Sequence, residues 1–122
     1  MKFIVIGLGG ALGAVCRYSF SLIPFKYTFP LLTLLINLIG STVIGFIIGL
    51  SMTNNLSPNT ILFWQTGVCG GFTTFSTFSA ETLGLFQAGK IFQGSVYIIL
   101  SIGLCLLGVF LGQCLARTVV RQ

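Results

Sequence analysis

Apolar residues fill four long stretches of the chain, and short segments containing polar residues, proline or glycine separate them. The stretches cover residues 3–22, 31–52, 61–88 and 91–116. A helix needs about 20 apolar residues to cross the hydrocarbon core of a membrane, and each stretch is long enough. The pattern predicts an all-α membrane protein, in which residues 1–122 form a single transmembrane domain of four helices.

The separating segments carry residues that favour the ends of helices. Pro24 and Pro30 lie between the first two stretches, and residues 54–59, which include three asparagines, a serine and a proline, lie between the second and the third. Gly89 and Lys90 divide the third stretch from the fourth. Proline, glycine and asparagine favour turns, so we expect short loops here. The first stretch is longer than the core of a secretory signal, so we expect it to remain as a helix.

The composition agrees with a membrane protein and argues against nucleic-acid binding. Of the 122 residues, 55% are hydrophobic and only 6% are charged, and the net charge is +5. The basic residues are Lys2, Arg17, Lys26, Lys90, Arg117 and Arg121. They lie singly near the predicted helix ends, whereas a nucleic-acid surface needs a cluster. We therefore expect the chain to contact membrane lipid and no nucleic acid.

The same basic residues are divided equally between the two sides of the membrane. With four spans, Lys2, Arg117 and Arg121 fall on one side and the other three on the opposite side. The one-sided excess of Lys and Arg that sets the orientation of many membrane proteins is therefore missing. A chain that inserts both ways can pair with an antiparallel copy of itself, so we expect a dual-topology homodimer. The alternative is that a lipid or another partner sets one orientation.

The chain offers few groups for catalysis or for a side-chain metal site. It has one acidic residue and no histidine, and its cysteines form no C-x-x-C pair. The cysteines are Cys16, Cys69, Cys105 and Cys114. Paired acid–base chemistry and a cysteine–histidine metal site both lack parts. We expect a protein that is not an enzyme and whose cysteines act in packing.

Small and polar residues recur at helical spacing. Glycines four residues apart let helix backbones approach closely, and they occur as Gly9 and Gly13, Gly45 and Gly49, and Gly108 and Gly112. One face of the second stretch carries Thr33, Asn37 and Ser41, and one face of the fourth carries Tyr97, Ser101 and Cys105. An asparagine inside a membrane is costly, so Asn37 either joins two helices through hydrogen bonds or serves a transport pathway.

The third stretch contains the densest group of polar residues. Gly70 and Gly71 weaken a helix, and the threonines and serines after them satisfy backbone groups that a break releases. We therefore expect this helix to be broken near the middle of the membrane. Such a break presents carbonyl groups to cations and amide groups to anions.

Two aromatic rings follow the expected break. Phe75 and Phe78 lie three residues apart on one helical face, with Thr77 and Glu81 beside them. The edge of an aromatic ring is electropositive, so two rings presented edge-on form an apolar constriction that tolerates an anion. This arrangement suits a small, strongly hydrated anion that exchanges water for fixed donors. The alternative is a packed phenylalanine pair beside a kink.

These segments resemble one known family along essentially the whole chain. The sequence of residues 70–79, GGFTTFSTFS, is similar to the signature of the Fluc fluoride channels, also called CrcB proteins. Residues 9–18, GGALGAVCRY, and residues 37–41, NLIGS, are similar to the family's first and second helices. The resemblance implies passive export of fluoride through an antiparallel homodimer in the inner cell membrane. Such export reduces the toxicity of fluoride in the cytoplasm.

The resemblance also implies a role for each matched residue. Phe75 and Phe78 would present their ring edges to fluoride, and Asn37 would donate a hydrogen bond to it. Carbonyl groups of both subunits, from Gly70 and Thr73, would bind a structural sodium ion. A polar track beside the rings would consist of Thr77, Glu81, Tyr97 and Ser101, with Cys105 in place of a further hydroxyl. Arg17 would lie near the mouth of the pathway and raise the local concentration of anions.

Two other classes of membrane protein have a similar size. Small multidrug exporters also have four helices and dual topology, and they exchange protons for cationic drugs through one membrane glutamate. That glutamate belongs to their first helix, whereas Glu81 lies in the third stretch here. A structural subunit of a membrane assembly would not need a broken helix. A proton-coupled exporter that uses Glu81 is therefore the alternative to the fluoride channel.

Overall fold

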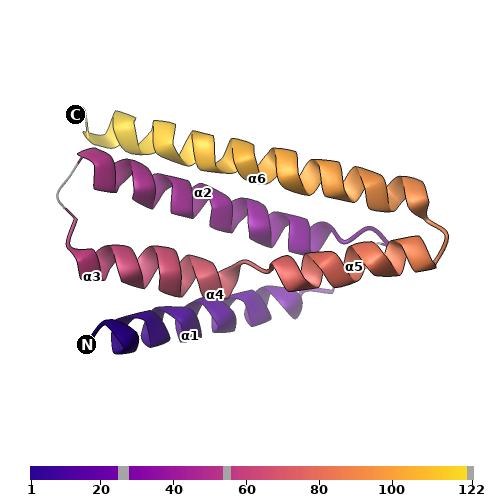
Figure 1. Cartoon of the computed structure of the whole chain (residues 1–122), viewed down its shortest axis with the longest axis horizontal. Helices are drawn as coiled ribbons and strands as arrows, with labels where there is room; N and C mark the ends of the chain where they lie inside the picture. Colours follow the sequence, from indigo (N-terminus) through magenta and orange to yellow (C-terminus); the bar gives the residue numbers. More distant parts are fainter. Residues whose placement is uncertain (25–27, 54–55, 121–122) are drawn as a thin grey trace.

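The computed structural model describes residues 1–24, 28–53 and 56–120, which form helices and no strands. The helices are α1 (Lys2–Ser21), α2 (Leu31–Thr53), α3 (Pro58–Ile61), η1 (Leu62–Cys69), α4 (Gly70–Phe72), α5 (Phe75–Gln87) and α6 (Ile91–Val120). They form an elongated bundle in which the start of α1 and the end of α6 lie at the same end (Figure 1). Lys26, residues 54–55 and Arg121, on which some of the predictions rest, lie outside the described residues.

The helices agree with the predicted apolar stretches. Among the described residues, α1, α2 and α6 are long and apolar enough to cross a membrane. The predicted third helix is instead a series of four elements, α3, η1, α4 and α5, which we call the third span. Its start is capped by Ser57, whose hydroxyl accepts a hydrogen bond from the Thr60 N–H at 3.2 Å. The prediction of an all-helical membrane protein is confirmed.

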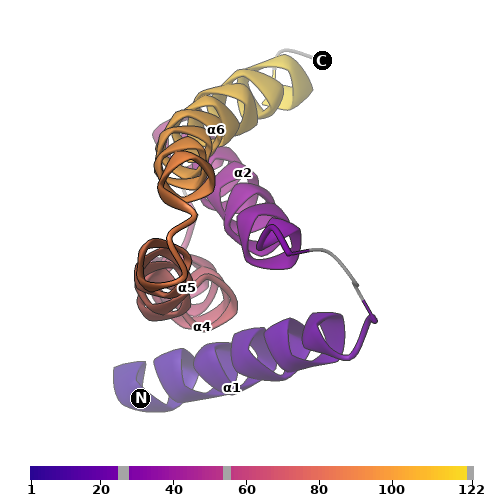
Figure 2. The ribbon, with the colours of Figure 1, turned by 90° about the vertical axis from the view of Figure 1, so that its right-hand side faces the viewer.

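The helices pack in two pairs. α2 packs along α6, while η1 and α4 pack against α1. Viewed along the bundle, α4 and α5 lie between α1 and the pair formed by α2 and α6 (Figure 2). The third span is therefore the central element of the fold.

Glycines allow the closest approaches in both pairs, as their spacing predicts. A Cβ atom at Gly13 would overlap the carbonyl oxygen of Val68, and one at Gly71 would overlap that of Gly10. Between α2 and α6, a Cβ atom at Gly45 would overlap the backbone of Val109. The backbones meet directly at these points, so any side chain there would push the helices apart.

The third span is broken, but not at the two glycines. Gly70 has helical angles (φ −64°, ψ −37°), and the helix continues through Phe72. The backbone becomes extended at Thr73 (φ −77°, ψ 158°) and Thr74 (φ −149°, ψ 110°) before α5 begins. The predicted break in this helix is confirmed, and it lies two to three residues after the glycine pair, just before Phe75. Gly71 serves the close contact with α1, and the break occurs where a side chain from α2 replaces the helical hydrogen bonds.

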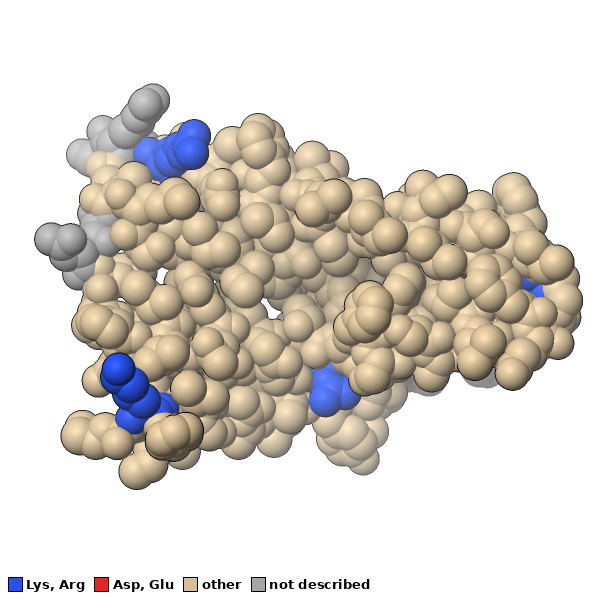
Figure 3. Space-filling model, in the orientation of Figure 1, with Lys and Arg blue, Asp and Glu red and all other residues tan. Residues whose placement is uncertain are grey.

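The exterior of the chain is largely apolar. Phe3 is 90% exposed and Phe75 is 79% exposed, whereas Tyr97 is completely buried beside Leu34 and Leu85. On the face shown in Figure 3, lysine and arginine atoms form isolated spots rather than a continuous patch. Such an apolar surface suits lipid or another apolar partner.

Candidate functional site

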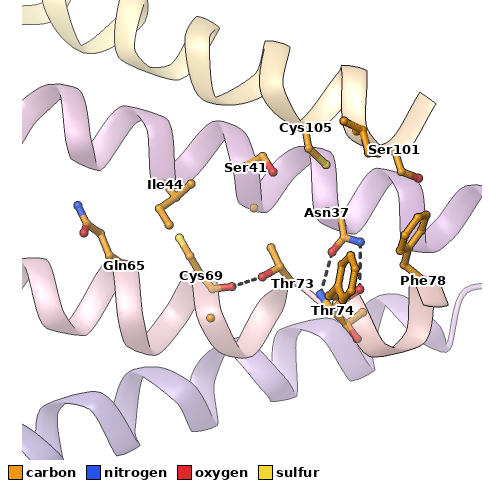
Figure 4. Close-up of a pocket in the computed structure, with 14 residues that line it drawn as sticks. Asn37, Ser41, Ile44, Gln65, Cys69, Thr73, Thr74, Phe78, Ser101 and Cys105 are labelled. Atoms are coloured by element: carbon orange, nitrogen blue, oxygen red, sulfur yellow. Dashed lines mark hydrogen bonds between the residues drawn. The ribbon is translucent and has the colours of Figure 1, made fainter. Parts of the chain in front are cut away.

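Asn37 bridges α2 and the break in the third span. Its side-chain oxygen accepts a hydrogen bond from the Thr74 N–H at 2.8 Å, and its Nδ2 donates to the Thr74 carbonyl at 3.1 Å (Figure 4). The asparagine thus satisfies both backbone polar groups of one extended residue. A carboxamide has two N–H donors, so one of them remains for another acceptor.

Thr74 also caps the start of α5. Its hydroxyl accepts a hydrogen bond from the Thr77 N–H at 3.2 Å and donates to the Thr77 hydroxyl at 2.9 Å. In an unbroken helix, the N–H groups of residues 74 and 77 would donate to the carbonyls of residues 70 and 73. Because both N–H groups donate to side chains here, the carbonyls of Gly70 and Thr73 lose their helical donors.

Arg17 satisfies a third carbonyl near the break. Its Nε donates to the Gly71 carbonyl oxygen at 3.2 Å, and its side chain is partly buried between α1 and α4. Gly71 would otherwise accept a hydrogen bond from the Phe75 N–H. The guanidinium therefore stabilises the break from the side opposite to α2.

A cavity of about 340 Å³ lies between α2, the third span and α6. One water needs about 10–15 Å³ of such volume, so the cavity has room for several waters or a hydrated ion. The polar side chains that line it are Asn37, Ser41, Gln65, Thr73, Thr74 and Ser101. Its walls also include Cys69, Gly70, Phe75, Phe78 and Cys105. A membrane cavity lined by these donors and rings can hold a small polar solute.

The two predicted phenylalanines meet at the edge of this cavity. Their ring centroids are 5.5 Å apart, with 43° between the ring planes. Phe78 also contacts Tyr97, with centroids 5.1 Å apart, and therefore lies between Phe75 and the buried tyrosine. Phe75 is largely exposed in a single chain. The prediction that the pair shares one face is confirmed.

Glu81 joins three helices through its carboxyl group. Oε1 accepts a hydrogen bond from the Thr33 hydroxyl at 2.8 Å, and Oε2 accepts one from the Tyr97 hydroxyl at 2.7 Å. Thr33 and Tyr97 belong to α2 and α6, and both are buried. The acidic group is therefore held by hydroxyl donors beside Phe78.

The structure brings most of the predicted site residues together, in three groups. Those that line the cavity are Asn37, Gly70, Thr73, Phe75, Phe78 and Ser101. Glu81 and Tyr97 lie outside its lining on the far side of Phe78, and Thr77 lies behind the Thr74 cap. Arg17 contacts Gly71 from α1 and does not line the cavity formed by the described residues.

Ser101 differs from the other polar residues of the group. It is only 7% exposed, and its hydroxyl oxygen has no hydrogen-bond partner among the described residues. An unpaired buried hydroxyl is costly unless water or a ligand supplies the missing hydrogen bond. Ser101 is therefore a member of the cavity wall whose hydroxyl is left unpaired by the described residues.

Sequence reasoning missed two features of the site. Gln65 lines the cavity, although the only signal was a single amide within an apolar run. The residues of η1 form a π-helix, which no local pattern indicated. Short π-helical segments are rare and are frequent at functional sites.

The fold and the cavity define a small helical membrane protein with a polar site inside the membrane. Residues 4–113 match the family described as CrcB-like protein, Camphor Resistance (CrcB). The match covers most of the chain, and the chain belongs to this family.

Named relatives support the same assignment. A protein of Ruminiclostridium cellulolyticum named "Fluoride-specific ion channel FluC" is 48% identical, over 98% of this chain and 95% of its own length. Proteins with the same name from Clostridium novyi and Methanocaldococcus jannaschii are 43% and 40% identical, over 95% and 98% of this chain and 94% and 98% of their own lengths. The resemblance of the sequence to the Fluc (CrcB) family is therefore confirmed.

Proposed function

We propose that this chain is a fluoride-selective ion channel of the cell membrane, which lets fluoride leave the cytoplasm down its gradient. The observation that carries the proposal is the cavity in which the Asn37 amide lies near the Phe75–Phe78 pair, in a chain similar to fluoride-specific channels. Hydrogen fluoride is a weak acid that crosses membranes and dissociates inside, so such a channel lowers fluoride toxicity. No enzymatic step is involved.

The donors of the site suit a small anion. Asn37 retains one amide N–H, and the Ser101 hydroxyl lacks a partner. Fluoride that sheds water needs fixed donors of this kind, and the edges of Phe75 and Phe78 supply a positive but dry wall. Thr77, Glu81 and Tyr97 continue a polar track behind the rings. Arg17 contributes positive charge near the break, which raises the local concentration of anions.

The proposed channel is an antiparallel homodimer in the inner cell membrane. Phe75 is 79% exposed in a single chain, and Gly70 is also exposed. Among the described residues, a Cβ atom added to Gly70 would meet only the Gln65 carbonyl oxygen, at 3.9 Å. A second copy would cover this open backbone and complete the ring pair, and the balanced basic residues support opposite orientations.

We also propose a structural sodium ion at the break. Gly70 and Thr73 have carbonyl oxygens without helical donors, and hard cations prefer such oxygen ligands. One chain supplies two of these carbonyls, and an antiparallel partner would supply two more. The ion would hold the two breaks together.

The proton-coupled drug exporter is less well supported. Both oxygens of Glu81 already accept hydrogen bonds from hydroxyl groups of the chain. The named relatives are channels for fluoride.

Efflux from liposomes tests the proposed function. Purified protein is reconstituted into vesicles loaded with potassium fluoride, and valinomycin clamps the membrane potential while an electrode measures external fluoride. We expect rapid release that scales with the amount of protein. Release no faster than from protein-free vesicles would contradict the proposal, and drug-dependent proton exchange would favour the exporter.

A further inference from the structure

Gln65 presents a free amide group to the end of the cavity that is remote from the phenylalanine rings. The residue lies on η1 and lines the same cavity as Asn37 (Figure 4). In this view, Gln65 and Phe78 lie at opposite ends, with Ser41 and Asn37 of α2 between them. Among the described residues, no hydrogen bond uses the Gln65 side chain.

An unpartnered amide is costly inside a membrane. Transferring such a group into an apolar environment without a hydrogen bond costs on the order of 2–7 kcal/mol. In η1 the residues before Gln65 are apolar, namely Leu62, Phe63 and Trp64, and Thr66 follows it. An apolar side chain would therefore fill this position at lower cost. The glutamine is explained if water or a solute in the cavity satisfies its amide.

The π-helix places this amide in line with the break. In a π-helix each N–H bonds to the carbonyl five residues earlier, so one turn covers between four and five residues. Cys69 and Gly70 follow Gln65 by four and five residues, and all three line the cavity. Thr73 and Thr74 continue the same wall one turn later. The π-helical winding thus extends one polar wall from the break to Gln65.

We propose that Gln65 is an anion-contacting residue at the end of the cavity remote from the phenylalanine rings, and that it passes fluoride to the Asn37 site. Its amide offers two neutral N–H donors, which suit an anion that is losing water. Ser41 provides a hydroxyl between the two amides. The inference rests on the proposed channel function. It gives Gln65 the role of the first fixed hydrogen-bond donor that fluoride meets on that side of the rings.

Substitutions of opposite charge separate a contact with the anion from a structural role. Gln65→Met keeps the length of the side chain and removes the donors, Gln65→Glu adds a negative charge, and Gln65→Lys adds a positive one. Gln113→Met on α6 is the matched control, since Gln113 does not line the cavity among the described residues. Fluoride efflux is measured at high and low ionic strength for variants with unchanged gel-filtration profiles.

We expect Gln65→Met to slow efflux about tenfold at low fluoride, as for the loss of one hydrogen bond to a charged group. The half-saturating fluoride concentration should rise. Gln65→Glu should slow efflux further, most strongly at low ionic strength. The efflux rate of Gln65→Lys should equal or exceed that of Gln65→Met. Gln113→Met should match the wild-type chain.

Equal rates for Gln65→Met and wild type would overturn the inference, as would equal losses in the Glu and Lys variants. If the charged variants fail to fold, the efflux rate and the half-saturating fluoride concentration of Gln65→Met alone test the inference. Wild-type protein without efflux would contradict the proposed function itself, whereas normal wild-type efflux with unaffected Gln65 variants would contradict only this inference.

Discussion

The side-chain amide of Asn37 holds both backbone polar groups of Thr74, with hydrogen bonds of 2.8 and 3.1 Å across two helices. The break in the third span is therefore built by α2 as much as by its own sequence. Since α2 and the third span also form two walls of the cavity, the contact that fixes the break also fixes the site.

Replacing Asn37 should cost both stability and flux. Asn37→Ala leaves the N–H and carbonyl of Thr74 without their partners, and each such buried group costs about 1–3 kcal/mol. We expect a lower unfolding temperature in detergent, measured by circular dichroism, and loss of fluoride efflux. Ser41→Ala, one turn away on the same face, should change the unfolding temperature much less. Equal unfolding temperatures for Asn37→Ala and wild type would show that the bridge is unimportant for stability.

The two phenylalanines should differ in their effect on stability but not on flux. Phe75 is mostly exposed in one chain, whereas Phe78 packs between Phe75 and Tyr97. We expect Phe75→Ile and Phe78→Ile each to reduce fluoride efflux by more than tenfold, since both remove an electropositive ring edge. Only Phe78→Ile should lower the unfolding temperature of the detergent-solubilised protein. Unchanged efflux in both variants would remove the rings from the pathway.

The helices could be predicted from the sequence because their causes are local. Apolar length defines the spans, and the lines of Thr33, Asn37 and Ser41 follow from helical spacing alone. All three residues do face the third span. Thr33 bonds to Glu81 and Asn37 bonds to Thr74, while Ser41 lines the cavity. Glycine spacing likewise identified the close contacts of α1, α2 and α6 with their neighbours.

The sequence predicted a break near the glycine pair, but not the residues at which the backbone opens, since their hydrogen-bond partners lie on other helices. Gly70 and Gly71 are the weakest local helix formers, yet both stay helical because Gly71 packs against Gly10. The chain opens three residues later, where Asn37 replaces the helical partners of Thr74. The sequence of η1, which aligns Gln65 with the cavity, carries no local signature of a π-helix.

Glycines at helix contacts should be intolerant of a methyl group, in contrast to glycines facing open space. A Cβ atom at Gly13 would overlap the Val68 carbonyl, while one at Gly7 has nothing within 4 Å. We expect Gly13→Ala to destabilise the protein by about 1–3 kcal/mol through overpacking. Gly7→Ala should be neutral or stabilising by up to about 1 kcal/mol, because alanine favours helix. Thermal unfolding of the two variants in the same detergent checks this, and an equal loss in both would contradict the packing.

The hydroxyl donors of Glu81 should be energetically coupled to it. Tyr97→Phe removes the 2.7 Å hydrogen bond to Oε2 and leaves the ring in place. Hydrogen bonds between membrane helices contribute about 0.6 kcal/mol on average and up to about 1.7. A double-mutant cycle of Tyr97→Phe with Glu81→Gln should give a coupling energy in this range. Tyr18→Phe, at an exposed position, is the control and should not couple to Glu81. Coupling as small as that of the control would argue against the contact.

Removing sodium should weaken the proposed dimer. The carbonyls of Gly70 and Thr73 have no helical donors, so without a cation they would face each other unsatisfied at the antiparallel contact. We expect dialysis into N-methyl-D-glucamine to lower the unfolding temperature and to increase the monomer fraction, measured by chemical cross-linking in detergent. Readdition of sodium should restore both quantities, whereas an equal unfolding temperature and dimer fraction with and without sodium would contradict the ion site.

Selectivity between two halides tests the central claim most directly. Vesicles containing the wild-type protein are loaded with equal concentrations of fluoride and chloride, and two ion-selective electrodes follow their release under a potassium clamp. A cavity that replaces the water of a small anion by the donors around Asn37 predicts fast and complete loss of fluoride, with chloride retained as in protein-free vesicles. Equal release of both ions, or retention of both, would contradict the account.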